Sequence, residues 1–215
     1  MPDEPHLPAD RPAEHYFSAS PASADERRPL RVRLDGRELE LVTAPSVFSG
    51  DRLDLGTAVL LDAVPDPPAD GELLDLGCGW GPVALTMALR SPEPTTRRVW
   101  AVDVNERARD LTATNAASLG LSGIRTAAPE DVDDDVSFSA VWSNPPIRIG
   151  KPALHALLLR WLPRLAPGGS AHLVVAKDLG ADSLLRWIGE QGEEHGWTAH
   201  RTASRKGYRV LEVSR

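Results

Sequence analysis

The sequence predicts an α/β protein that folds around a doubly wound, mostly parallel sheet. From Glu72 onward, short apolar segments typical of buried strands alternate with segments of helical periodicity, which is the pattern of successive βαβ units. The pattern changes near the C-terminus, where predicted strands at Thr198–Thr202 and Tyr208–Val213 flank a Lys-Gly turn. This last hairpin adds an antiparallel edge, so the sheet is predicted to be mixed.

A separate hairpin and one helix are predicted before this sheet. Residues Arg31–Asp35 and Glu38–Val42 alternate between polar and apolar side chains on either side of an Asp-Gly tight-turn signal. A short helix is predicted near Thr57–Ala63, and three prolines within the next five residues end it. Together they are expected to form an N-terminal extension of the sheet.

The remaining elements follow from apolar runs and from residues that cap helices. Asn105 is a predicted N-cap, Gly120 is a helix stop, and Pro82 opens a helix where its missing N–H costs little. The predicted strands are Leu73–Leu76, Val99–Asp103, Ile124–Ala127, Phe138–Trp142 and Ala171–Val175. The predicted helices are Pro82–Arg90, Asn105–Leu119, Lys151–Leu162 and Asp182–Glu194.

Length and composition suggest one globular domain with an appendage. Six of the 19 prolines fall within residues 1–29, which are expected to be a disordered or loosely docked arm. Residues 30–70 would form the hairpin and helix extension, and residues 71–215 the main domain. No apolar run approaches the roughly 20 residues of a membrane helix, and no signal peptide is recognisable. A cytoplasmic protein with no membrane partner is therefore expected.

The charge balance argues against attraction to nucleic acid by bulk charge. The formal net charge is −7, and five of the six residues at 130–135 are acidic. From residue 197 to the end, however, five bases accompany a single acid, so a basic edge is available locally. Cys78 is the only cysteine, which excludes an intrachain disulfide and a cysteine-cluster metal site. The six histidines lack metal-ligand spacing, so no metal is expected.

A glycine-rich loop joins the first strand of the predicted sheet to its helix. It reads Asp75-Leu-Gly77-Cys-Gly79-Trp-Gly81, and its alternate spacing differs from the G-x-G-x-x-G fingerprint that binds a pyrophosphate. A carboxylate at the strand end repels phosphate but suits a ligand rich in donors, such as S-adenosylmethionine with its ammonium and sulfonium groups. Asp103 ends the next strand, where its carboxylate can accept both ribose hydroxyls of such a ligand.

These two segments resemble the first two motifs of the class I S-adenosylmethionine-dependent methyltransferases. The resemblance covers roughly residues 72–215 and implies that residues 71–215 form a class I methyltransferase domain. It implies a Rossmann-like, seven-stranded mixed sheet in the order 3-2-1-4-5-7-6, with its strands counted from residue 72. It also implies that Gly77 and Gly79 lie under the methionine part, that Asp103 holds the ribose and that Val104 packs on adenine. The implied cofactor-binding set is Asp75, Gly77, Cys78, Gly79, Gly81, Asp103, Val104 and Asn144, joined by Glu130 or Asp131 at the adenine amino group.

An Asn-Pro-Pro sequence follows the predicted strand Phe138–Trp142. Two consecutive prolines fix the backbone and disfavour a helical conformation at Asn144, so this loop should be rigid. The Asn144 side-chain oxygen and the Pro145 carbonyl can each accept an N–H of a planar amine, which points its lone pair at a methyl group. Positioning and aimed acceptors then carry catalysis without a strong base. The expected catalytic residues are Asn144, Pro145, Pro146 and Ile147.

The wider pattern resembles the methyltransferase small family, whose characterised bacterial members methylate the guanine 2-amino group of small-subunit ribosomal RNA. The segments that carry this resemblance are His15–Ser18, Val47–Ser49, Leu53–Thr57, Asn144–Lys151 and Lys206–Val210. It implies an S-adenosylmethionine-dependent N-methyltransferase that acts on 16S ribosomal RNA, free or within the small ribosomal subunit. A monomer or weak dimer is expected. The residues implied to bind substrate are Phe48, Thr57, Arg148 and Lys151.

Two features depart from the family pattern. The residue after the prolines, usually aromatic, is Ile147, which gives up part of a stacking interaction worth about 1–3 kcal/mol per base. Some relatives also carry a second, degenerate methyltransferase domain at the N-terminus, where this chain has residues 1–29. Two alternatives therefore stay open, namely methylation of a protein glutamine amide and a non-catalytic accessory protein that binds the cofactor.

Overall fold

The computed structural model describes residues 26–215. Most of the predicted arm at residues 1–29, and all of the segment His15–Ser18, lies outside this range. The described chain forms a two-stranded sheet and a seven-stranded sheet with the order β5-β4-β3-β6-β7-β9-β8. The strands of the large sheet are β3 (Glu72–Leu76), β4 (Val99–Val102), β5 (Ile124–Ala127), β6 (Phe138–Ser143), β7 (Leu165–Ala176), β8 (Thr198–Arg205) and β9 (Tyr208–Ser214).

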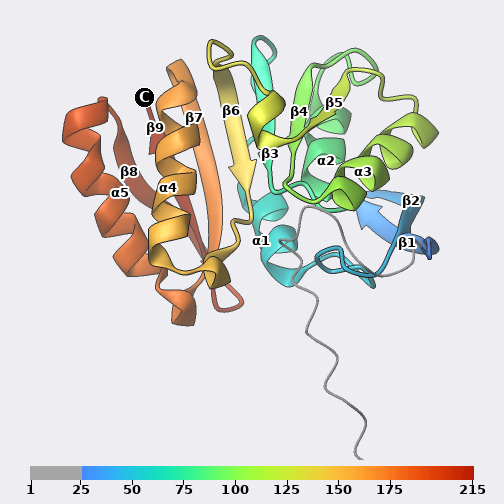
Figure 1. Cartoon of the computed structure of the whole chain (residues 1–215), viewed down its shortest axis with the longest axis horizontal. Coiled ribbons are helices and arrows are strands. Elements are labelled where there is room, and N and C mark those ends of the chain that lie inside the picture. The colour runs from blue at the N-terminus through green and yellow to red at the C-terminus, as the bar shows by residue number, and fades with distance from the viewer. Residues whose placement is uncertain (1–25) are drawn as a thin grey trace, which may run out of the picture.

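The strand order confirms the predicted 3-2-1-4-5-7-6 arrangement. The first five strands in space run parallel, and β9 pairs antiparallel with both β7 and β8. Helices cover both faces of this sheet (Figure 1). The helices are α1 (Leu55–Ala63), α2 (Pro82–Arg90), α3 (Glu106–Ser118), α4 (Lys151–Trp161) and α5 (Ala181–His195).

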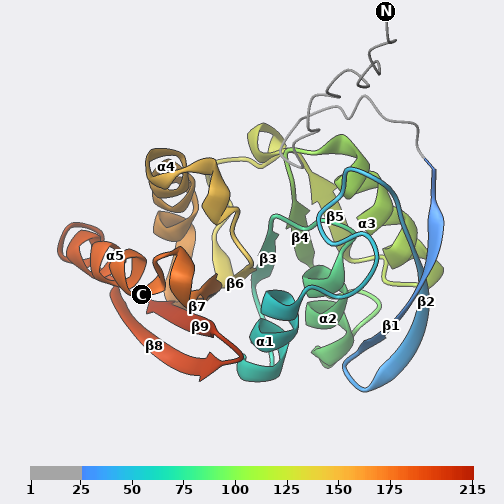
Figure 2. The same ribbon diagram turned by 90° about the horizontal axis from the view of Figure 1, so that it is seen from below.

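The sheet separates two apolar layers because successive strand residues point to opposite faces. Leu73 packs into a layer with α1, α2, α3 and the N-terminal hairpin, whereas Leu74 packs into a layer with α4 and α5. The same alternation separates Val174 from Leu173 in β7. Figure 2 shows α1 and α2 on one side of the sheet and α4 and α5 on the other. Both faces are thus buried, as a parallel sheet requires.

The predicted hairpin consists of β1 (Arg28–Leu34) and β2 (Arg37–Thr43). Its turn residues Asp35 and Gly36 have φ angles of 49° and 73°, the left-handed pair that a two-residue hairpin turn needs. The buried Asn115 of α3 accepts the Val42 N–H at 2.8 Å and donates to the Val42 carbonyl at 2.9 Å. This side chain therefore ties β2 of the hairpin to helix α3.

The predicted boundaries differ from the observed ones most at β7. The Pro-Gly-Gly turn expected before Ala171 lies inside β7, which begins at Leu165, and the register with β6 shifts there. A Cβ on Gly169 would lie 2.8 Å from the Phe138 carbonyl oxygen, so glycine lets the strands approach at this irregularity. Within residues 26–215, no helix is both long and apolar enough to cross a membrane.

Candidate functional site

A pocket of about 410 Å³ opens at the carboxyl ends of the parallel strands. Its lining includes Leu76 at the end of β3, Val102 at the end of β4 and Asn144 just after β6. Strand β3 is the point from which the chain winds toward β5 on one side and β6 on the other, and such switch points form crevices that bind ligands. The volume lies in the range of small-molecule sites.

The glycine loop forms one wall of the pocket. The N–H groups of Gly77 and Cys78 donate to the Val102 carbonyl at 2.8 and 3.2 Å, which ties the loop to the neighbouring strand. Gly77 and Gly79 line the pocket with φ angles of 84° and 57°, which side chains rarely adopt. A Cβ on Gly77 would meet no protein atom within 4 Å. The backbone is thus bare where a ligand can approach it.

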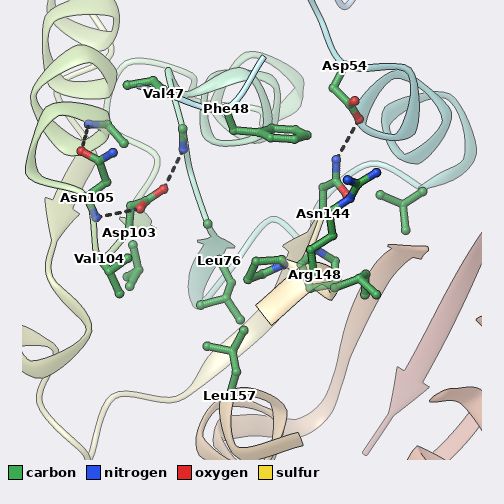
Figure 3. A pocket seen from close by; sticks show the side chains of 18 of the residues that line it. Val47, Phe48, Asp54, Leu76, Asp103, Val104, Asn105, Asn144, Arg148 and Leu157 are labelled. Atoms are coloured by element: carbon green, nitrogen blue, oxygen red, sulfur yellow. Dashed lines mark hydrogen bonds between the residues drawn. The ribbon is translucent and has the colours of Figure 1, made fainter. Parts of the chain in front are cut away.

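Asp103 lies beside this wall and is held by backbone donors. Its Oδ2 accepts the Gly79 N–H at 3.0 Å and its Oδ1 accepts the Asn105 N–H at 2.9 Å. Burial raises the pKa of the Asp103 carboxyl, and these N–H bonds act against that rise. The next side chain, Val104, also lines the pocket and is 44% exposed. Figure 3 shows both side chains on the same side of the pocket.

Three predicted cofactor residues lie behind the wall rather than on the main pocket. Asp75 is buried, and its Oδ2 accepts the Ala84 N–H at 2.9 Å in the first turn of α2, where the N-cap Gly81 has no side chain. Burial raises the pKa of Asp75 to about 8. Burial likewise raises the pKa of the Cys78 thiol, whose sulfur lies 3.5 Å from the Thr112 hydroxyl. Asp75, Cys78 and Gly81 therefore shape the loop from behind.

The two acids proposed for the adenine amino group are exposed. Glu130 and Asp131 lie in a short 3-10 helix, Pro129–Asp131, at the end of β5. Pro129 lines the pocket, but the structure brings neither carboxylate to it. The choice between the two acids stays a prediction.

The Asn-Pro-Pro corner faces the glycine loop across the pocket (Figure 3). The Asn144 Nδ2 group donates to Asp54 Oδ2 at 2.8 Å and to Thr57 Oγ1 at 3.0 Å. Pro146 has φ −74° and ψ 74°, and the Ile147 N–H donates to the Pro145 carbonyl at 2.8 Å, which is an inverse γ-turn. The Pro145 oxygen keeps one lone pair, and the Asn144 amide is fixed by a carboxylate and a hydroxyl.

Phe48 extends over the pocket from the loop between β2 and α1. It lines the pocket and is 45% exposed. Two hydrogen bonds hold the loop that carries Phe48. Asn105 Nδ2 donates to the Ser46 carbonyl at 2.9 Å, and Trp80 Nε1 donates to the Ser49 carbonyl at 3.2 Å. The glycine loop and the start of α3 thus fix the segment that covers them.

The remaining predicted residues are Ile147, expected to be catalytic, and Thr57, Arg148 and Lys151, expected to bind substrate. Thr57 is buried and contacts Asn144 instead of facing the main pocket. Ile147 is half-buried and lines the pocket, and Arg148 lines it while exposed to solvent. Lys151 is exposed in the first turn of α4 and does not line the pocket.

The pocket contains residues to which the sequence analysis gave no individual role, and two of them are Asp54 and Tyr208, from the segments Leu53–Thr57 and Lys206–Val210 that carry the family resemblance. Asp54 is the N-cap of α1, with Oδ2 accepting the Thr57 N–H at 2.9 Å, and this D-x-x-T capping pattern was the available signal. Tyr208 reaches the pocket from β9, and a Cβ on Gly56 would lie 2.8 Å from its ring. Burial raises the pKa of Tyr208, and the charges of Asp54 and Asp178 raise it further. No sequence signal placed this ring beside α1.

The chain is similar to one protein family, to several proteins of known sequence and to several solved structures. The family described as the methyltransferase small domain matches residues 38–212. An uncharacterized Bacillus subtilis protein, YbxB, is 29% identical over 206 residues, which are 94% of this chain and 99% of that protein.

Two further relatives carry names that state an activity. Ribosomal RNA small subunit methyltransferase C of Pseudomonas aeruginosa is 33% identical over 182 residues, covering 83% of this chain and 52% of that protein. A solved T. thermophilus 16S rRNA N2-guanine methyltransferase in complex with AdoMet and guanosine has a TM-score of 0.73 at 23% identity, covering 91% of this chain and 52% of that one. The chain thus spans about half the length of these two relatives.

Proposed function

Because the chain belongs to the methyltransferase small domain family, we propose that it is an S-adenosylmethionine-dependent methyltransferase whose target is the 2-amino group of guanine in 16S ribosomal RNA. The observation that carries this proposal is the clamped amide of Asn144, which faces a bare glycine loop across one pocket. The glycine-loop wall of the pocket suits S-adenosylmethionine, and the wall that carries Asn144 suits the guanine amino group.

The first wall fits S-adenosylmethionine by the chemistry of its groups. Gly77 and Gly79 offer a surface without side chains, and a Cβ on Gly77 would project into open space. Asp103 supplies carboxylate oxygens for ribose hydroxyls, and the exposed Val104 supplies an apolar face for adenine. Asp75, Cys78 and Gly81 keep the loop in place from behind.

The second wall fits a planar amine. Both Nδ2 hydrogens of Asn144 are taken by Asp54 and Thr57, so its Oδ1 is the atom left to accept a hydrogen bond from a ligand. Pro145 and Pro146 hold this amide on a turn that the proline rings stiffen. Phe48 and Ile147 both line the pocket, so an aromatic and an aliphatic side chain are available to pack on a base.

The mechanism we propose rests on positioning. When bound, S-adenosylmethionine supplies the methyl group, so that a nitrogen–carbon bond forms as the sulfur–carbon bond breaks, S-adenosylhomocysteine remains, and the nitrogen loses one proton to water. Asn144 Oδ1 accepts one N–H of the target and draws its lone pair out of the ring system. The Pro145 carbonyl accepts the other N–H with its remaining lone pair. Orientation of this kind is worth about 7–11 kcal/mol of a barrier.

Ribosomal RNA as the substrate is supported by the named relatives and by the charges at the pocket entrance. Arg148 lines the pocket while exposed, and Lys151 lies three residues further along the chain. Both can hold phosphates next to a nucleotide that has left its stack. The acidic run at residues 130–135 follows β5, and none of its residues lines the pocket.

The test is methyl transfer by the full chain with S-adenosylmethionine that carries a tritium-labelled methyl group. The acceptors are ribosomal RNA and 30S subunits from cells that lack this protein, and the nucleosides are then identified by mass spectrometry. We expect label in N2-methylguanosine at one position. Label in ribosomal protein or release factor would instead support glutamine methylation, and cofactor binding without transfer to any acceptor would support an accessory role.

A further inference from the structure

Asp54 brings a carboxylate to the pocket next to the Asn144 amide. Its Oδ2 accepts two hydrogen bonds, from the Thr57 N–H at 2.9 Å and from Asn144 Nδ2 at 2.8 Å. Within residues 26–215, no protein donor bonds to its Oδ1. The residue is half-buried and lines the pocket. One carboxylate oxygen is therefore used to build the site, and the other is available to a ligand.

This arrangement also fixes which way the Asn144 amide points. A carboxylate oxygen only accepts hydrogen bonds, so the amide NH2 group must face Asp54, and the amide oxygen lies on the opposite branch. Asn144 and Asp54 both line the pocket, and the acceptor atoms that their side-chain hydrogen bonds leave over are the Asn144 Oδ1 and the Asp54 Oδ1. Figure 3 shows the two side chains facing each other at one end of the pocket.

Guanine is the base that matches two adjacent acceptors. Its 2-amino group stands next to N1–H, so one edge carries donors side by side. In adenine and cytosine the amino group stands next to a ring nitrogen that is itself an acceptor, which a carboxylate repels. We propose that Asp54 selects guanine by accepting its N1–H bond while Asn144 holds the neighbouring amino group. This inference rests on the proposed function and deepens it.

The surroundings of Asp54 make the discrimination strong. The Tyr208 ring lies near Asp54, because a Cβ on Gly56 would lie 2.8 Å from that ring and 2.9 Å from the Asp54 Oδ2 atom. In such a partly apolar setting, a charged oxygen left facing an acceptor loses its water without gaining a partner. Sites built around a substrate N–H or O–H reject analogues that lack it far better than apolar pockets reject a change of size.

The experiment compares two RNA fragments that span the nucleotide identified by mass spectrometry. One carries guanine at that nucleotide, and the other carries 2-aminopurine, which keeps the 2-amino group but has an acceptor at N1. The wild type and Asp54→Asn are assayed on both for kcat/KM. The substituted side chain keeps one oxygen for Thr57 and Asn144 and puts an NH2 group in place of the other oxygen, and asparagine is also a good N-cap.

We expect the wild type to favour guanine at least about 100-fold, and Asp54→Asn to reduce this preference to about threefold or to invert it. Thr57→Val is the matched control, because it removes one acceptor of Asn144 Nδ2 and leaves the carboxylate in place. It should slow transfer to both fragments by the same factor and keep the wild-type preference.

The outcomes separate the two proposals. If the wild type methylates guanine and Asp54→Asn keeps the wild-type preference, with both rates lowered equally, Asp54 serves only to hold Asn144 and the inference is overturned while the proposed function stands. If the wild type methylates no guanine in ribosomal RNA, the proposed function fails and the inference fails with it.

Discussion

The two walls of the pocket are built in different ways. The glycine-loop wall comes from two neighbouring strands, β3 and β4, and the loops that follow them, and its hydrogen bonds join backbone groups to Val102 and Asp103. The opposite wall joins segments far apart in sequence, since Asn144 bonds to Asp54 across 90 positions. The first wall thus joins segments 24 positions apart in the sequence, and the second joins segments 90 positions apart. Substitutions in the two walls should therefore separate cofactor binding from catalysis.

Asn144→Ala should have the largest effect. It removes the acceptor that orients the target nitrogen, and loss of one aimed group of this kind costs roughly 100- to 1,000-fold in kcat. The affinity for S-adenosylmethionine, measured by calorimetry, should stay within about threefold, because Asp103 and the glycine loop are untouched. Full activity of this variant would contradict the division between the two walls.

Asp103→Ala should produce the opposite result. It removes charged acceptors that we assign to the ribose, and such hydrogen bonds are worth about 1.5–3 kcal/mol, or about 10- to 100-fold in Kd. With saturating cofactor, kcat should recover most of its wild-type value. Glu106→Ala, an exposed acid three positions further on, is the matched control and should bind the cofactor normally. Equal losses in both variants would mean that charge in general, and not the Asp103 site, attracts the ligand.

Gly77→Ala and Gly36→Ala form a matched pair. Both glycines have positive φ, 84° and 73°, and a Cβ on either would meet no protein atom within 4 Å. The strain of about 1–2 kcal/mol should lower the stability of both variants alike in urea unfolding. Only Gly77→Ala should also weaken S-adenosylmethionine binding, because its methyl group would occupy the pocket. Similar affinity of the two variants for S-adenosylmethionine would show that the cofactor does not bind at the glycine loop.

Asp75→Asn should have the smallest effect on activity and act on stability instead. The folded pKa of Asp75 is about 8 and its ordinary value is 3.8. Between these values the folded chain holds a proton that the unfolded chain has released, so the free energy of unfolding falls as pH rises, by up to about 1.4 kcal/mol per pH unit. Asp75→Asn should flatten this decline between pH 5 and 8. An unchanged pH profile would show that Asp75 is already charged in the fold.

The fold was largely predictable because its signals are local. Apolar runs, the Asn105 cap and the Asp-Gly turn of the first hairpin lie where the structure has them, and the helix Pro82–Arg90 matches to the residue. The start of β7 was wrong because its Pro-Gly-Gly segment is a common turn signal, and only pairing with β6 turns it into an irregularity of a strand.

The site was predictable in its motifs and not in its long-range contacts. The glycine loop and the Asn-Pro-Pro corner do line one pocket. Thr57 is predicted to bind substrate, and the contact that the structure shows for its hydroxyl is with the Asn144 amide, because α1 brings Thr57 there together with Asp54. Tyr208 enters the pocket from a strand at the far end of the sequence, and no spacing rule connects it to Gly56. Packing between distant segments decides such roles.

The most direct measurement is a crystal structure of the full chain with S-adenosylhomocysteine and guanosine bound. We predict electron density for the cofactor product over Gly77 and Gly79, with its ribose on Asp103. The guanine amino group should lie within hydrogen-bond distance of Asn144 Oδ1, and its N1 next to Asp54. Density for either ligand outside this pocket, or a guanine whose amino group points away from Asn144, would contradict the account.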